Sequence, residues 1–107
     1  MENLPLTEAV FLILLSLAAE ARHGYSILKD VSTMSDGRVR LSTGTLYGAL
    51  RRLLDARWIE RVREDESPRG RQAYRLTSIG RRNLQLEVGR VNHLARLAAL
   101  RVARKEL

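Results

Sequence analysis

The segment 41–54 carries hydroxyl groups, guanidinium groups and two glycines at spacings that suit contact with a nucleic acid. A helix turns by about 100° per residue, so its leucines gather on one side and its small and basic residues on the other. The apolar side holds Leu46, Leu50 and Leu53, and the other side or its edges hold Gly44, Thr45, Tyr47, Gly48, Arg51, Arg52 and Asp55. Glycine inside a helix costs about 1 kcal/mol relative to alanine, which a surface helix tolerates most easily where a partner approaches its backbone. The groove of a nucleic acid is such a partner; a solvated helix with glycines by chance is the alternative.

Side chains that commonly perform catalysis or bind metals are scarce in this chain. Cysteine is absent, which excludes disulfides and thiolate metal sites. The two histidines, His23 and His93, are isolated from each other, and no carboxylate pair has a spacing that suits general acid–base work. His23 is therefore interpreted as a structural residue near a helix start. We expect no enzymatic activity, no metal and no cofactor.

The charge balance points to an anionic partner. The 107 residues suffice for one domain with a real core, and they carry a formal net charge of +7. Arginine supplies nearly all the cations, because Lys29 and Lys105 are the only lysines. A small basic domain favours nucleic acid ahead of a membrane surface, and arginine suits bidentate contact with phosphate and with guanine edges.

No membrane segment is expected. The apolar run Ala9–Ala19 is too short to cross a bilayer and is interrupted by Ser16. The N-terminus lacks the cationic region of a signal peptide. We therefore expect a soluble, cytoplasmic protein.

Two helices are predicted to brace the segment 41–54. The first covers residues 7–21 and is apolar on almost every side, so it must be buried on more than one face. The second runs from about Gly24 to Ser32, and a turn follows at Ser35–Gly37. A short extended piece, residues 38–41, then leads into the basic helix, which Ser42 or Thr43 can cap. This order is typical of a helix-turn-helix with a longer than minimal linker.

A β-hairpin is predicted after the basic helix. Residues 58–63 and 72–77 have strand character, and the loop between them contains Pro68 and Gly70. A hairpin in this position is the wing of a winged helix-turn-helix, and Arg69 and Arg71 near its tip could reach phosphate or the minor groove. The alternative is a charged hairpin in which the acidic residues 64–66 simply balance the arginines. We expect the tip arginines near phosphate and the acidic residues facing solvent.

The C-terminal pattern, from Ser78 onward, predicts one helix of about 25 residues. Its apolar residues follow alternating steps of four and three, and they form a heptad seam of Leu84, Val88, Val91, Ala95, Ala98 and Val102. A helix of this length either folds back on the first helix or packs against a second subunit. Because the first helix is also apolar on nearly all sides, we expect a homodimer whose interface includes this seam together with Phe11 and Leu14.

The chain contains four stretches whose order and spacing together are specific: Thr7–Leu14, His23–Lys29, Leu41–Leu53 and Arg69–Gly80. On these residues the chain resembles the PadR-like transcriptional regulators over nearly its whole length. The fold expected is mostly α with a small β-hairpin, a winged helix-turn-helix plus a long C-terminal dimerisation helix. Residues 1–77 would form the DNA-binding part and residues 78–107 the dimerisation helix, in one compact unit.

The resemblance implies a homodimeric repressor that binds double-stranded DNA at a roughly palindromic operator. Its DNA-contacting residues would carry over to Ser42, Thr43, Thr45, Tyr47 and Arg51 in the helix and to Arg69 and Arg71 in the wing. Thr43 and Gly48 stand where family members often have proline, which leaves the base preference open.

Two further readings remain open from the sequence. Some relatives respond to aromatic compounds bound between the subunits, so a small aromatic effector is a candidate partner; Phe11, Tyr25 and Trp58 could line its pocket or belong to the core. No aromatic residue follows Tyr74. The alternative function is a winged-helix protein–protein adaptor without DNA binding. It would explain the acidic wing segment, but not the combination of Gly44, Gly48 and Arg51 on one face.

Overall fold

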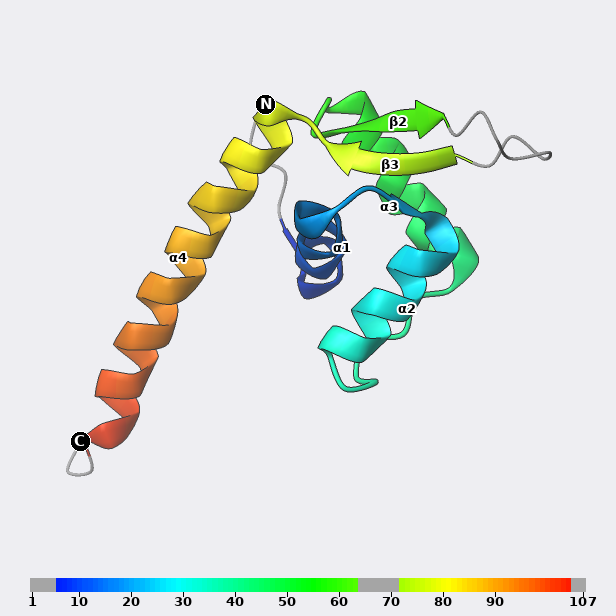
Figure 1. The fold of residues 1–107 in the computed structure, drawn as a ribbon. Helices are drawn as coiled ribbons and strands as arrows, with labels where there is room; N and C mark the ends of the chain where they lie inside the picture. The colour runs from blue at the N-terminus through cyan, green and yellow to red at the C-terminus, as the bar shows by residue number, and fades with distance from the viewer. Residues whose placement is uncertain (1–5, 64–71, 105–107) are drawn as a thin grey trace.

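The computed structural model describes residues 6–63 and 72–104, which form four α-helices and a three-stranded antiparallel sheet (Figure 1). The elements follow one another as α1 (Glu8–Ala19), β1 (Arg22–His23), α2 (Gly24–Met34), α3 (Thr43–Asp55), β2 (Ile59–Arg63), β3 (Gln72–Leu76) and α4 (Ser78–Ala103). Helices α1, α2 and α3 pack together beneath the sheet, and α4 leaves this body at one end. The expected winged helix-turn-helix with a long C-terminal helix is confirmed.

Hydroxyl side chains start three of the helices. The side-chain oxygens of Thr7, Ser42 and Thr77 each accept a hydrogen bond from the backbone N–H three residues later, at 3.0–3.1 Å. Such caps satisfy an N–H group that has no partner inside the helix. The predicted start of the basic helix at Ser42 is therefore confirmed.

The sheet contains a short strand that the sequence pattern did not reveal. β3 lies in the centre and pairs with β2 on one side and with β1 on the other, where Arg22 lies opposite Tyr74 and His23 opposite Ala73. A two-residue strand is too short to produce an alternating pattern, so no periodicity could have predicted it. It ties the junction between α1 and α2 to the hairpin.

The linker between α2 and α3 is held by a buried serine. The Ser35 hydroxyl accepts a hydrogen bond from the Val39 backbone N–H at 2.9 Å and can donate to the Ser32 carbonyl at 3.3 Å. Asp36 and Gly37 have positive φ angles of 54° and 81°, which turn the chain sharply. The expected turn at 35–37 is confirmed, and residues 38–41 form a loop without a sheet partner.

The core lies between the three packed helices and the sheet. Its fully buried side chains come from every helix and from the hairpin, with Ile13, Leu14 and Leu17 in α1 and Leu46, Leu50 and Leu53 in α3 among them. Leu14 and Leu84 were expected in a subunit interface, but they are 0% and 4% exposed within their own chain. These two positions must be corrected to core residues, because they offer no surface to a partner.

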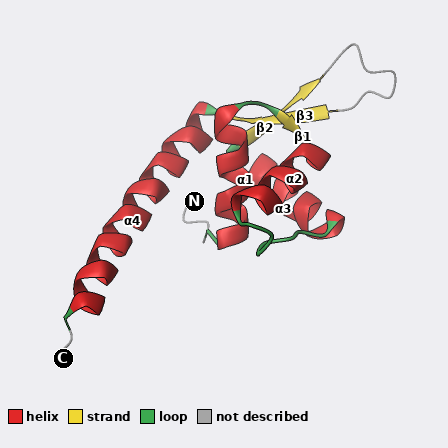
Figure 2. Ribbon diagram, turned by 60° about the horizontal axis from the view of Figure 1, so that its bottom comes forward, coloured by secondary structure: helices red, strands yellow, loops and turns green. Residues whose placement is uncertain are grey.

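Helix α4 projects from the body and leaves most of its length exposed (Figures 1 and 2). Its first turns pack on the body through Gly80 and Leu84, and the Arg81 guanidinium donates to the Ala18 carbonyl of α1 at 3.3 Å. Beyond residue 87 every described residue of the helix is exposed. The molecule therefore measures 63 × 30 × 22 Å. None of the helices within residues 6–63 and 72–104 is both long enough and apolar enough to cross a bilayer.

Candidate nucleic-acid interface

The exposed face of α3 consists of two adjacent rows of residues. One row, at four-residue spacing, holds Thr43, Tyr47 and Arg51, and the neighbouring row holds Gly44, Gly48 and Arg52. All six residues are exposed, while Leu46, Ala49, Leu50 and Leu53 on the opposite side are buried. The face predicted from the sequence is thus presented to the outside, with hydroxyl groups at its start and guanidinium groups toward its end.

The two glycines in this face have no role in packing the chain on itself. Apart from the adjacent residues and backbone of α3 itself, a Cβ atom added at Gly44 or at Gly48 would meet no atom of the described residues within 4 Å. Packing within the chain would therefore permit alanine at either position, although alanine would give a more stable helix by roughly 1 kcal/mol. Because the two glycines carry no side chain, a partner molecule can come close to the α3 backbone at these positions.

Two hydroxyl groups at the start of α3 are linked to each other. Ser42 Oγ accepts from the Thr45 N–H at 3.0 Å and donates to Thr45 Oγ1 at 2.9 Å. The Ser42 hydroxyl therefore caps the helix. Because Thr45 Oγ1 accepts in this contact, its own hydrogen can be donated to an acceptor outside the protein. Thr43 is exposed beside them.

Tyr47 spans the space between α3 and the start of α2. A Cβ atom added at Gly24 would overlap the Tyr47 hydroxyl and would lie 3.0 Å from Tyr47 Cζ. The ring nevertheless remains 46% exposed. One edge of the phenol thus packs on the α2 backbone while the rest of it belongs to the exposed face.

Arg22 fixes the start of α2 against α1. Its Nε donates to the Ser16 carbonyl at 2.7 Å and its Nη1 to Ser26 Oγ at 3.0 Å, while Nη2 lies 3.5 Å from the Asp30 carboxylate. A guanidinium that is only 20% exposed and bonded on three sides limits the movement of α2, on which Tyr47 rests. No periodic pattern of residue types predicts this contact.

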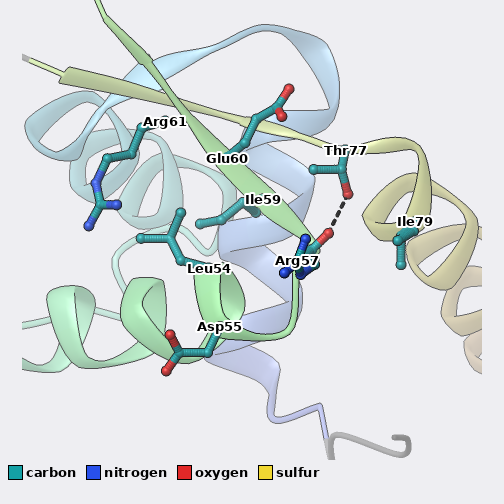
Figure 3. Close-up of a pocket in the computed structure, with 8 residues that line it drawn as sticks. All are labelled: Leu54, Asp55, Arg57, Ile59, Glu60, Arg61, Thr77 and Ile79. Atoms are coloured by element: carbon teal, nitrogen blue, oxygen red, sulfur yellow. Dashed lines mark hydrogen bonds between the residues drawn. The ribbon is translucent and has the colours of Figure 1, made fainter.

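Strand β2 carries two exposed arginines that were not among the predicted site residues. Arg61 and Arg63 alternate with Glu60 and Val62 along β2, so they leave the strand on the same face as Ile59, which packs toward the helices. Both arginines are exposed, and Figure 3 shows Arg61 on the Leu54 side of β2 and Glu60 on the other side. The signal available was the placement of two arginines two positions apart in a predicted strand, because side chains two residues apart lie on the same face. The predicted tip residues Arg69 and Arg71, and the acidic residues 64–66, lie outside the described part of the chain.

A pocket of about 660 Å³ opens between the end of α3, strand β2 and the start of α4 (Figure 3). Its lining is mixed, with Leu54, Ile59 and Ile79 beside Asp55, Arg57, Glu60, Arg61 and Thr77. Glu60 is paired across the sheet with Arg75 at 2.7 Å. Within residues 6–63 and 72–104, no three His, Cys, Asp or Glu side chains gather closely enough to hold a metal ion.

Glu87, a carboxylate with a lowered pKa, lies on α4, away from α3. A hydrogen bond from Arg90 holds the pKa of Glu87 below its ordinary value, and the same contact raises the pKa of Arg90. Both groups stay charged at neutral pH, and they form an ion pair between the exposed Arg90 and the partly buried Glu87, beside the apolar residues of α4.

A family model described as the transcriptional regulator PadR-like family matches residues 13–86. This match runs from the middle of α1 to the first turns of α4. The chain belongs to the PadR-like family of transcriptional regulators. Members of this family regulate transcription and are not enzymes. No curated protein sequence matches this chain.

Solved structures of PadR-family proteins share the fold. A regulator from Clostridium difficile R20291 superimposes with a TM-score of 0.76 at 23% identity, covering 91% of this chain and 100% of the other. A PadR-like regulator from Bacillus cereus gives a TM-score of 0.76 at 20% identity, covering 90% and 92%. Bacillus subtilis PadR, solved in complex with operator DNA, gives 0.65 at 20% identity, covering 74% of this chain and 45% of that one.

Proposed function

We propose that this PadR-like regulator is a cytoplasmic homodimer that binds double-stranded DNA at a roughly palindromic operator and represses transcription. Residues 1–77 would bind DNA and residues 78–107 would hold the dimer together. The observation that carries the proposal is the exposed face of α3, where two glycines without an internal packing role lie beside Thr43, Tyr47 and Arg51.

In this proposal α3 enters the major groove. Gly44 and Gly48 let its backbone come close to the DNA, and Thr43, Thr45, Tyr47 and Arg51 reach phosphates or base edges. Arginine can form two parallel hydrogen bonds to guanine, which gives it a direct role in reading sequence. Ser42 acts mainly by fixing the position of Thr45, because its hydroxyl both caps the helix and donates to Thr45 Oγ1.

The wing would add phosphate contacts beside this helix. Arg61 and Arg63 on β2 face the helix side of the hairpin, and Arg69 and Arg71 follow in the sequence, outside the described residues. Contacts of this kind set register and supply affinity that depends on salt, without reading sequence.

The dimer is supported by the apolar residues that α4 leaves uncovered. Val88, Val91, Leu94 and Leu97 are 36–45% exposed, and Ala95, Ala98 and Val102 continue the seam. Helix α1 adds Phe11, which is only half-buried in its own chain. An isolated monomer would expose this apolar stripe to water along most of a 26-residue helix, whereas a second copy would cover it.

Repression follows from occupancy of a promoter, because a dimer and the polymerase cannot hold the same DNA. We include no effector in the proposal. Trp58 is buried in the core, Phe11 packs against that core, and Tyr25 is 72% exposed at the start of α2.

A protein–protein adaptor is the competing function. It would use the same winged fold without DNA, and it would leave the open glycines of α3 unexplained. Selection from a pool of random duplex DNA, followed by titration of the selected sequence against a scrambled one, tests the proposal. Enrichment of an inverted repeat supports it; absence of binding to any duplex at low salt would favour the adaptor.

A further inference from the structure

The end of α3 and the beginning of α4 are joined by hydrogen bonds through two consecutive residues. α3 ends in a Schellman arrangement, in which the Arg57 N–H donates to the Leu54 carbonyl and the Trp58 N–H donates to the Leu53 carbonyl, both at 3.0 Å. Arg57 takes a left-handed conformation there, with φ of 66°. The carbonyl groups of Arg57 and Trp58 are consequently fixed relative to the axis of α3.

Both of these carbonyl groups are bonded to Thr77, the residue that caps α4. Thr77 Oγ1 donates to the Arg57 carbonyl at 2.6 Å (Figure 3), and the Thr77 backbone N–H donates to the Trp58 carbonyl at 3.0 Å. The same Oγ1 accepts from the Gly80 N–H at 3.0 Å, which starts α4. One hydroxyl group therefore connects the last turn of α3 to the first turn of α4.

Gly80 brings the two elements into direct contact. A Cβ atom added to Gly80 would overlap the Trp58 carbonyl oxygen and would lie 3.0 Å from the Trp58 Cα atom. The obstacle is backbone, which cannot rotate away as a side chain could. Only glycine lets α4 start at this position and in this direction.

We infer that Thr77 and Gly80 are positioning residues, which set the direction of α4 relative to α3 and thereby the spacing of the two α3 helices in the DNA-bound dimer. The inference rests on the proposed homodimeric DNA binding. Thr77 directly follows β3 and is half-buried. Neither Thr77 nor Gly80 needs to touch DNA for this role.

A small change of angle at this junction moves the far end of α4 by a large distance. At 1.5 Å per residue, the 26 residues of α4 span about 39 Å. A tilt of about 10° at Thr77 would move the far end of the helix by about 7 Å, the length of about two base-pair steps. Because dimers bind half-sites at a fixed separation, an error of this size would place the second α3 helix out of register.

Three variants separate positioning from simple stability. Thr77→Val keeps the shape of the side chain and removes the hydroxyl, whereas the matched control Thr77→Ser keeps the hydroxyl and both of its hydrogen bonds. Gly80→Ala removes no donor or acceptor but forces α4 away from the Trp58 carbonyl. Circular dichroism and light scattering identify the variants that remain folded and dimeric.

The first readout is the distance between spin labels within one subunit. The chain has no cysteine, so Arg52→Cys on α3 and Arg96→Cys on α4, both at exposed positions, can be labelled specifically. Mixing with an excess of unlabelled protein isolates the distance within a single chain. We expect Thr77→Val to broaden the distance distribution, Gly80→Ala to shift its maximum, and Thr77→Ser to match the wild type.

The second readout is the preference for half-site spacing, measured without labels. DNA selected by the wild type is compared with the same DNA carrying one or two extra base pairs between the half-sites. The ratio of interest is the affinity for the selected DNA divided by the affinity for the DNA with extra base pairs. We expect Thr77→Val to lower this ratio at least fivefold, while its affinity for a single half-site stays the same. A folded, dimeric Thr77→Val protein with wild-type distances, or with a wild-type affinity ratio, would overturn the inference. Failure of the wild type to select any DNA would instead refute the proposed function, and the label distances would still report whether the junction sets the direction of α4.

Discussion

The phenolic oxygen of Tyr47 lies where a Cβ atom of residue 24 would stand, so a side chain on Gly24 would require the Tyr47 ring to move. The contact joins α3, whose exposed face is the candidate DNA-binding surface, to the first residue of α2. Glycine at the start of a helix adds no stability of its own. Its presence at position 24 is explained by the tyrosine that packs on it.

This relationship predicts a dependence between two substitutions. Gly24→Ala should destabilise the protein by at most about 1 kcal/mol, because the new methyl group must displace the Tyr47 ring, which is half-exposed and can move. Tyr47→Phe removes the oxygen that the methyl group meets first, so the double variant should recover most of the loss. Thermal or urea unfolding of the four proteins measures the coupling. Strict additivity of the two changes would contradict the contact.

A second prediction concerns reading of DNA by α3. Arg51→Ala should weaken binding to selected operator DNA by about 1–3 kcal/mol, or about 5- to 150-fold, if its guanidinium contacts a base. Arg82→Ala, an equal loss of charge at an exposed position near the start of α4, serves as the control. Fluorescence anisotropy on labelled duplex gives both affinities. Equal affinities for the two variants would show that Arg51 does not contact the DNA.

A third prediction distinguishes the two faces of the wing. Arg63 lies on the helix side of β2, whereas Arg75 leaves β3 on the opposite side and pairs with Glu60. Arg63→Ala should make the dependence of log K on log salt shallower by about one, and it should weaken all sequences alike. Arg75→Ala should leave the slope unchanged. The reverse result would mean that the other face of the hairpin meets DNA.

A fourth prediction tests the seam of α4. Val91→Asp places a carboxylate among the apolar residues of the proposed interface, and we expect it to dissociate the dimer because an unpaired buried charge is costly. Asn92→Asp introduces the same group one residue later, outside the seam, and should leave the dimer intact. Light scattering reports a particle of one or two 12.2 kDa chains. A two-chain particle for Val91→Asp would refute the seam.

A fifth prediction concerns the strained end of α3. Arg57 has φ of 66°, a region that favours glycine by roughly 1 kcal/mol. Arg57→Gly should therefore raise the melting temperature by several degrees. Arg52→Gly, inside the same helix, should lower it by a similar amount. A lower melting temperature for Arg57→Gly would mean that the Arg57 side chain contributes stability of its own.

The local signals in the sequence were sufficient for the helices and the hairpin. Hydroxyl caps, apolar periodicity and turn residues act over a few neighbouring positions, so the start of α3 at Ser42 and the approximate strands 58–63 and 72–77 could be predicted. The order of these elements with their motifs indicated the family. These features require no knowledge of contacts between distant segments.

Contacts between distant segments could not be predicted in the same way. Strand β1 has two residues and exists only because β3 pairs with it. Leu84 belongs to the apolar pattern of α4 but packs into the core of its own chain, and periodicity cannot distinguish these partners. The packing of Tyr47 on Gly24 likewise depends on how α2 and α3 cross.

The most direct test of the proposed function is the stoichiometry of the complex with selected DNA. Sedimentation of the protein with a duplex carrying the enriched sequence reports the mass of the complex at low and at physiological salt. We expect two chains per duplex and symmetrical protection of two half-sites, with affinity that falls as salt rises. A protein that stays unbound at low salt, or that binds every duplex equally as a single chain, would contradict the proposal.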